Sequence, residues 1–151
     1  MNFIGVASAA PFFSLWQECM AGCRICMENI GKVGGAMIVS ASRRTDIPAF
    51  YFDWFCERLR DGYVDVVNPF NRKQVSRISL KPEAVDCIVF WTKDPAPMLR
   101  GLDKLSAYPY YVQISITPYG KDIEANLRPK ADIIKTVQEL SRRLDRERVV
   151  W

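Results

Sequence analysis

From residue 37 onward, short apolar runs alternate with stretches in which apolar residues recur every three or four positions. The runs at 37–42, 63–67, 87–91 and 110–117 predict β-strands, a shorter extended piece falls at 75–80, and another strand begins at 148. The helical spacing predicts helices between Asp46 and Gly62, between Asp94 and Pro109, and at 131–144. Strands that alternate with amphipathic helices favour right-handed crossovers, so the sequence predicts an α/β fold with a mainly parallel sheet.

Several local signals fix parts of this pattern. Asp46 can cap the first helix, Pro48 suits its first turn, and Gly62 ends it. The run at 87–91 is uninterrupted and apolar, which is typical of a central strand covered on both faces. One face of the last helix is expected to carry Ile133, Ile134, Val137, Leu140 and Leu144. The strand and helix pattern alone leaves a barrel and an open sheet as alternatives.

Residues 1–36 differ from residues 37–151. The first stretch is rich in Ala, Gly and Cys, has balanced charges and shows only a weak helical pattern. We therefore expect a poorly structured extension at 1–36, either translated or the result of a start codon placed too early, followed by the first part of an α/β domain at 37–151. We expect that domain to be truncated at its carboxyl end, because a closed eight-stranded barrel usually takes about 250 residues.

Composition narrows the possible functions. The chain is 49% hydrophobic and 25% charged with a formal net charge of +4, as in an ordinary globular domain. It contains no histidine, which excludes Ser-His-Asp and Cys-His nucleophile arrangements and any histidine metal ligand. No uninterrupted apolar run approaches the roughly 20 residues of a membrane-spanning helix, so we expect no membrane association and a cytoplasmic location.

Polar residues collect where the predicted strands end, which is where parallel α/β folds place their binding sites. The candidate substrate-binding or anion-binding residues are Arg43, Arg44, Asp46, Asn68, Lys93 and Tyr119. Arginine forks suit phosphate or carboxylate, and lysine adds a compact positive charge. The alternative for each residue is structural: an arginine could pair with Asp46 or Asp94 to lock the loops, and each of these aspartates could be a helix cap.

Cys19, Cys23 and Cys26 have the spacing C-x3-C-x2-C, which can hold three irons of a cubane cluster and leave the fourth open for S-adenosylmethionine. Ile25 stands before the last cysteine, where radical S-adenosylmethionine enzymes usually have an aromatic residue. The sequence leaves open whether these cysteines bind a cluster.

Residues 37–151 resemble the bacterial family known as domain of unknown function 1848. The blocks that carry the resemblance are IVSASRRTDIPAF (38–50), VNPFN (67–71), VSRISL (75–80), VDCIVFWTKDPAPML (85–99) and ITPYGKDIE (116–124). The resemblance implies a partial, unclosed TIM-like barrel of the radical S-adenosylmethionine type, distantly similar to spore photoproduct lyase and DNA repair photolyase-type proteins.

The same resemblance implies a 4Fe-4S cluster and S-adenosylmethionine as cofactors. In the family, the cysteine motif lies near the far carboxyl end, which is absent here, so the resemblance gives this chain no metal ligands and no identified catalytic residue. The expected function is therefore that of the amino-terminal half of a radical S-adenosylmethionine-like enzyme, inactive alone, with an anion-binding loop face. Its exposed sheet edge is expected to self-associate or to pair with the missing carboxyl-terminal segment.

Two other functions remain open. A module without a cluster could bind phosphate or nucleic acid through basic loop residues, namely Arg43, Arg44, Arg72, Lys73 and Arg77. A phosphate-handling barrel enzyme without a metal is also compatible with the loop chemistry. The expected partners are thus an anionic small molecule or a nucleic acid.

Overall fold

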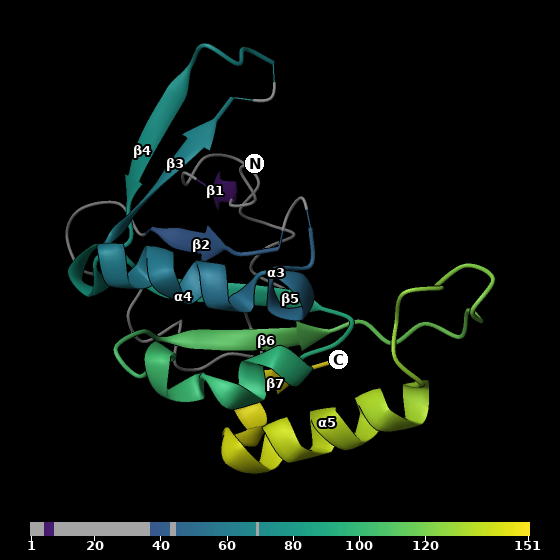
Figure 1. Cartoon of the computed structure of the whole chain (residues 1–151). Helices are drawn as coiled ribbons and strands as arrows, with labels where there is room; N and C mark the ends of the chain where they lie inside the picture. The colour runs from purple at the N-terminus through teal and green to yellow at the C-terminus, as the bar shows by residue number, and fades with distance from the viewer. Residues whose placement is uncertain (1–4, 8–36, 43–44, 69) are drawn as a thin grey trace.

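Figure 1 shows the computed structural model of the chain, which describes residues 5–7, 37–42, 45–68 and 70–151, the first of these ranges by its backbone alone. A five-stranded sheet has the order β1-β2-β5-β6-β7. Its strands are β1 (Gly5–Ala7), β2 (Ile38–Ser40), β5 (Cys87–Thr92), β6 (Tyr110–Ile114) and β7 (Val149–Val150). Within this sheet, β2, β5, β6 and β7 are parallel, and β1 pairs antiparallel with β2. The predicted α/β class and mainly parallel sheet are confirmed.

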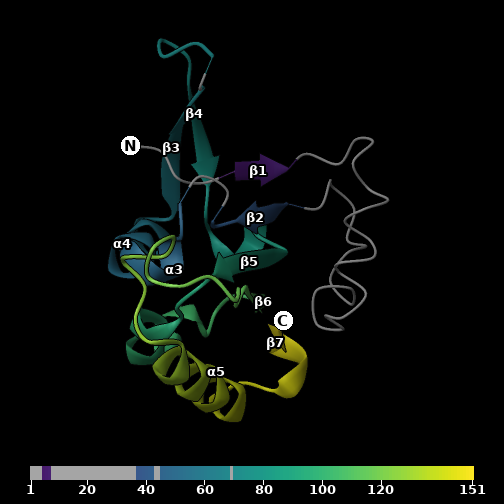
Figure 2. The same cartoon turned by 90° about the vertical axis from the view of Figure 1, so that its right-hand side faces the viewer.

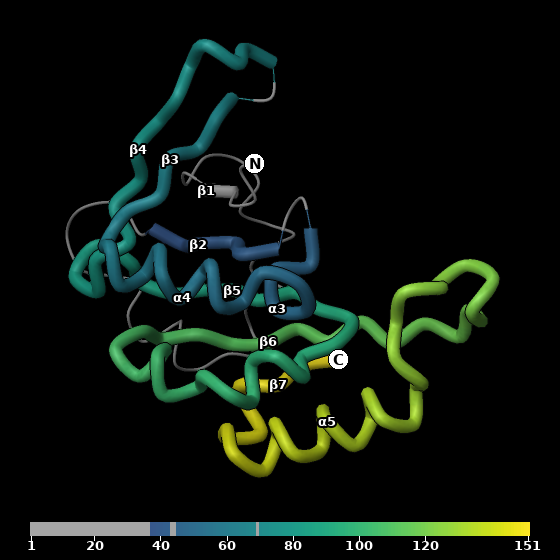
Figure 3. The backbone as a smooth tube through the Cα atoms, in the orientation of Figure 1, coloured from purple at the N-terminus to yellow at the C-terminus, as the bar shows by residue number. Residues whose placement is uncertain are grey.

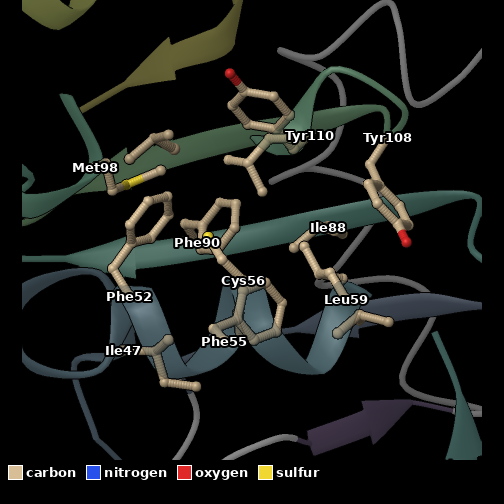
Figure 4. Packing of buried hydrophobic residues seen from close by; sticks show 14 of the residues in the cluster. Ile47, Phe52, Phe55, Cys56, Leu59, Ile88, Phe90, Met98, Tyr108 and Tyr110 are labelled. Atoms are coloured by element: carbon tan, nitrogen blue, oxygen red, sulfur yellow. The ribbon is translucent and has the colours of Figure 1, made fainter. Parts of the chain in front are cut away.

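Strand β5 is central, as its uninterrupted apolar sequence predicts. Its side chains alternate between the two faces of the sheet, and all of them except Trp91 are buried. The ring of Phe90 packs between the sheet and helix α4 (Phe52–Asp61). Its centroid lies 5.5 Å from that of Phe55 on the helix and 5.9 Å from that of Tyr110 on β6. Figure 4 shows this aromatic cluster between the strands and the helix below them. The main core therefore lies on one face of the sheet.

The helices are α3 (Ile47–Phe50), α4 (Phe52–Asp61) and α5 (Lys130–Arg143), with short 3-10 turns at η1 (Pro82–Ala84) and η4 (Arg146–Arg148). Helix α4 buries a stripe at positions i, i+3, i+4 and i+7, made by Phe52, Phe55, Cys56 and Leu59. Gly62 ends it with a left-handed φ of 76°, as the sequence predicts. In α5, Ile133 and Leu140 are buried as predicted, whereas Ile134 is 44% exposed, so its predicted place on the buried face is wrong.

The predicted helix between Asp94 and Pro109 is instead two 3-10 helices, η2 (Ala96–Arg100) and η3 (Leu102–Leu105). Pro95 and Pro97 fall in the first turn of the predicted helix, where an α-helix tolerates proline, so the break comes later in the segment. Gly101 separates the two turns, and a Cβ there would lie 3.0 Å from a ring carbon of Phe52. The glycine thus lets the turn pack directly on α4.

The strand predicted at 63–67 is present, but it does not join the five-stranded sheet. Strand β3 (Tyr63–Val67) pairs antiparallel with β4 (Val75–Ser79) in a separate two-stranded sheet. The connection at 68–74 is too short for a parallel crossover, which takes a dozen residues or more, so the chain forms a hairpin. In Figures 1 and 2 this hairpin extends away from the five-stranded sheet.

A long segment without regular structure joins β6 to α5, and the tube in Figure 3 follows it out from the sheet and back. Strand β6 ends at Ile114, earlier than the predicted residue 117. Strand β1 was not predicted; the rest of the predicted extension, with Cys19, Cys23 and Cys26, lies outside the described residues. Since β7 is an outer strand of the described sheet, pairing at its edge stays a prediction. Among the helices that the structure describes, none has the length and apolar character needed to cross a membrane.

Candidate functional site

A hollow of about 290 Å³ lies at the carboxyl ends of the parallel strands β2, β5 and β6. Its lining residues are Ser42, Asp46, Trp91, Thr92, Lys93 and Ser115. They come from the segments that follow or end these three strands, which is the edge where the polar residues were predicted to meet. Every lining side chain except Trp91 has a hydroxyl, a carboxylate or an ammonium group.

Asp46 joins two of these segments. Its Oδ1 accepts a 3.0 Å hydrogen bond from the backbone N–H of Ala49, and its Oδ2 accepts one of 2.7 Å from the backbone N–H of Lys93. The first bond confirms Asp46 as the cap of α3. Burial raises the pKa of Asp46 against the opposing effect of these hydrogen bonds. Among the described Lys and Arg side chains, none makes an ion pair with it, so its charge is balanced by backbone and hydroxyl dipoles.

Three hydroxyl residues, Ser42, Thr92 and Ser115, also line the hollow. The backbone N–H of Trp91 donates a 3.2 Å hydrogen bond to Oγ of Ser42. Thr92 is 1% exposed, and its Oγ1 accepts a 3.1 Å hydrogen bond from the backbone N–H of Asp94. The backbone N–H of Ser115 donates to the carbonyl oxygen of Thr92 over 2.9 Å. These bonds hold the ends of three strands in fixed positions around the carboxylate of Asp46.

The side chain of Lys93, which lines the first hollow, pairs with Glu124. Its Nζ donates to Oε1 of Glu124, which also accepts a 2.7 Å hydrogen bond from Oγ1 of Thr117. The Glu124 side chain is 9% exposed, and its second oxygen lies 3.6 Å from Nζ of Lys130. The hydrogen bonds from Lys93 and Thr117 hold the pKa of Glu124 below its usual range. The charge of Lys93 is therefore already paired within the protein.

Among the described residues, Arg128 is the arginine that binds Asp94. Nε and Nη2 of Arg128 each donate a 2.6 Å hydrogen bond to a different oxygen of the Asp94 carboxylate. Nη2 also donates to Oγ1 of Thr136 on α5 over 2.9 Å. Burial raises the pKa of Asp94, but the bonds from Arg128 and from the backbone of Ala96 bring it below its ordinary value. The paired bonds between Arg128 and Asp94 connect the end of the segment between β6 and α5 to the end of β5.

A second hollow, of about 320 Å³, lies within the segment between β6 and α5. Its lining residues are Pro118, Tyr119, Gly120, Lys121, Glu124, Leu127, Arg128, Pro129 and Lys130. Tyr119 is 51% exposed, and its carbonyl oxygen accepts a hydrogen bond from Nζ of Lys130. Glu124 lines this hollow and pairs with Lys93 of the first one, so the two hollows are neighbours.

The structure brings together only some of the predicted site residues. Asp46 and Lys93 meet in the first hollow, and Tyr119 lines the second. Asn68 is not with them, because β3 belongs to the hairpin; its amide donates to Gln74 and accepts from the backbone of Phe70. Arg43 and Arg44 lie outside the described residues.

Sequence reasoning missed Ser115, Glu124, Arg128 and Lys130. Glu124 and Arg128 lie in a stretch without helical or strand spacing, so no periodic pattern distinguished them from other polar loop residues. Ser115 falls within the strand predicted at 110–117, and Lys130 is the first residue of α5. The only sequence signal was the position of this stretch after a parallel strand.

The described residues do not fit an iron-sulfur cluster. Within them, no group of three or more Cys, Asp or Glu side chains could hold a metal ion. Cys56 and Cys87 are both buried, on α4 and β5, and burial raises the pKa of the Cys56 thiol to about 11. The C-x3-C-x2-C motif lies outside the described part of the chain.

The fold and the site define an α/β protein with a polar hollow at the carboxyl ends of its parallel strands. A family model for a domain of unknown function, DUF1848, matches residues 38–151. The chain belongs to this family. No curated protein and no solved structure matches the chain.

Proposed function

We propose that this chain forms the ligand-binding part of a radical S-adenosylmethionine-like enzyme, and that the first hollow binds the amino-acid portion of S-adenosylmethionine. The observation that carries the proposal is the carboxylate of Asp46. It lies at the converging strand ends without an ion-pair partner among the described residues. It can therefore accept hydrogen bonds from the ammonium group of a ligand.

The hydroxyl groups around Asp46 support a small, polar ligand. Ser42 and Ser115 line the same hollow from the segments after β2 and β6, and their hydroxyls can donate or accept as a ligand requires. Their backbone positions are fixed by hydrogen bonds between neighbouring strands. A site that is held in place before the ligand arrives loses less entropy on binding.

In this proposal, Arg43 and Arg44 bind the anionic group of the ligand, and Lys93 does not. Lys93 is neutralised by Glu124, so it adds little net positive charge for a ligand carboxylate. Arg43 and Arg44 lie between Ser42 and Asp46 in the sequence, and we assign the ligand carboxylate to them. An ammonium at Asp46 and a carboxylate at the arginines would select a zwitterion over a simple anion.

The proposal assigns binding to these residues and no reaction step, because the described residues do not fit a cluster. The phosphate-binding module remains the competing function for the same face. It predicts binding of inorganic phosphate that depends on Arg43 and Arg44 and gains nothing from the charge of Asp46.

Isothermal titration calorimetry with S-adenosylmethionine separates these functions. We expect Asp46→Asn to weaken binding by at least about tenfold, since an ionic hydrogen bond contributes about 1.5–3 kcal/mol. Asparagine is also a good helix cap, so α3 should keep its start. The control is Asp65→Asn on the hairpin, which removes the same charge away from the hollow.

No heat of binding with S-adenosylmethionine, or equal affinity of the Asp46→Asn variant and the wild type, would refute the assignment. Binding of inorganic phosphate in place of S-adenosylmethionine would favour the cluster-free module. Thermal melting of each variant shows whether a lost affinity comes from a lost fold.

A further inference from the structure

The geometry points to the β3–β4 hairpin as an arm that binds double-stranded DNA, with its tip in the major groove. This surface is separate from the two hollows and does not rest on the ligand proposed for them. Four features carry the inference: the projection of the hairpin, its charge, its exposed aromatic ring and its ordered tip.

The hairpin projects as a two-stranded ribbon with an anchored base. Figures 1 and 2 both show it extending beyond the five-stranded sheet. At its base, the backbone N–H of Leu80 donates to the carbonyl oxygen of Gly62 over 2.8 Å. The hydroxyl of Tyr108 donates to the carbonyl oxygen of Leu80 over 2.7 Å. The base is thus fixed to the core while the tip is free to meet a partner.

The tip exposes an aromatic ring beside basic side chains. Phe70 is 98% exposed, and Val75 is 55% exposed. Arg72 and Lys73 are exposed between them, and neither makes an ion pair within the described residues. No Asp or Glu occurs at 66–82, so the outer part of the arm is basic, and Asp65 nearer its base is paired with Arg77. A positive arm complements a polyanion such as a phosphate backbone.

Arg77 is part of the arm's structure rather than of its contact surface. Its Nε and Nη2 donate hydrogen bonds of 2.8 and 2.9 Å to the two oxygens of Asp65 on the paired strand. Its guanidinium also lies 4.2 Å from the ring centroid of Tyr63. The basic residues left for a partner at the tip are therefore Arg72 and Lys73.

The tip is ordered by its own side chains. Asn68 donates to Gln74 over 2.7 Å and accepts from the backbone N–H of Phe70 over 2.9 Å. Oδ1 of Asn71 accepts from the backbone N–H of Lys73 over 3.2 Å. These bonds fix the backbone at Phe70 and Lys73, so contact with a partner orders little additional backbone there.

A two-stranded ribbon fits the major groove of B-form DNA, which is about 12 Å wide. In this arrangement Arg72 and Lys73 reach phosphates, and Phe70 makes apolar contact with thymine methyl groups or base edges. An anionic membrane is the less favoured partner, because lipid-binding segments usually cluster about four to eight basic residues beside a broad apolar face.

Fluorescence anisotropy with a labelled duplex of about 20 base pairs tests the inference at about 50 and 200 mM salt. We expect Arg72→Ala combined with Lys73→Ala to weaken binding at least about tenfold at the lower salt and to reduce the salt slope by about 2. Phe70→Ala should weaken binding about threefold or more and leave the salt slope unchanged.

The matched control combines Lys135→Ala with Arg142→Ala, which removes the same charge from exposed positions on α5. It should bind within about twofold of wild type. No duplex binding, equal losses in the hairpin and α5 variants, or tighter binding to the single strand or to vesicles with anionic lipid would overturn the inference. Because all the substituted side chains are exposed, circular dichroism should show the same fold in each variant.

Discussion

The carboxylate of Asp46 accepts a 2.7 Å hydrogen bond from the backbone N–H of Lys93, which lies 47 positions later in the chain. The side chain of Lys93 then meets Glu124 in the segment after β6. Three segments that follow β2, β5 and β6 are thereby joined through one carboxylate, one lysine and one glutamate. The loops around the first hollow should move together rather than independently.

Arg128→Ala should destabilise the protein, because it leaves the buried carboxylate of Asp94 without its two charged hydrogen bonds. We expect a loss of about 1–3 kcal/mol in the free energy of unfolding, the usual effect of an unsatisfied buried acceptor. Urea denaturation measures it. Arg142→Ala is the control: this arginine pairs with Glu139 at the surface, where such pairs contribute about 1 kcal/mol or less. Equal losses in the two variants would contradict the role of the Arg128 fork.

The Asp94–Arg128 pair should make stability depend on acidic pH. The pKa of Asp94 is lower in the folded protein than in the unfolded chain, where it is about 4. Its contribution to stability is therefore fully present above the unfolded value and is lost as the pH falls through the lower, folded value. Asp94→Asn should be less stable than wild type near neutral pH, and the gap should narrow as the pH falls below the unfolded value of about 4. Urea melts across that range measure the gap, and a constant difference would count against the pair.

Phe90→Ala should remove more stability than any exposed aromatic substitution. Phe90 is fully buried between Phe55, Phe52 and Tyr110, and deletion of a buried aromatic ring costs about 3–5 kcal/mol. Phe70→Ala, at the exposed hairpin tip, should change stability by less than about 0.5 kcal/mol. Denaturation midpoints of the two variants provide the comparison; similar values would mean that the core is not where the structure places it.

Gly62→Ala should destabilise the end of α4 by about 1–2 kcal/mol, because the residue has a φ of 76°. The space beside it is adequate: an added Cβ would lie 3.4 Å from Cγ of Lys81, an ordinary contact. The effect should therefore come from the backbone. Gly62→Asn should cost less, since asparagine tolerates the left-handed region better than alanine. If the two variants melt alike in thermal unfolding, the backbone explanation fails.

The order of strands and helices along the chain could be predicted from the sequence. Which strands pair with each other could be predicted only in part. The run at 87–91 predicted a central strand because its apolar sequence has no alternation. The hairpin was missed because strand character alone does not say which strand a segment pairs with; the short connection at 68–74 was the available signal. Asn68 was placed in the site for the same reason.

The candidate site was partly predictable because the carboxyl ends of parallel strands meet at one edge. Lys93 directly follows β5 and Asp46 lies in the short loop after β2, so their convergence required only the correct topology. Glu124 and Arg128 lie farther from β6, in a segment without periodic pattern, and their partners are determined by its tertiary path. Likewise, Ile134 is exposed because the buried face of α5 is set by packing against η2 and η4 rather than by the helical period alone.

The account depends most on ligand binding at the converging ends of β2, β5 and β6. The direct measurement is a titration of the isotope-labelled protein with S-adenosylmethionine, followed by amide chemical shifts in two-dimensional NMR spectra. The account predicts saturable shifts at Ser42, Asp46, Lys93 and Ser115, with the hairpin amides unchanged. No saturable shift, or shifts confined to segments away from this hollow, would contradict it.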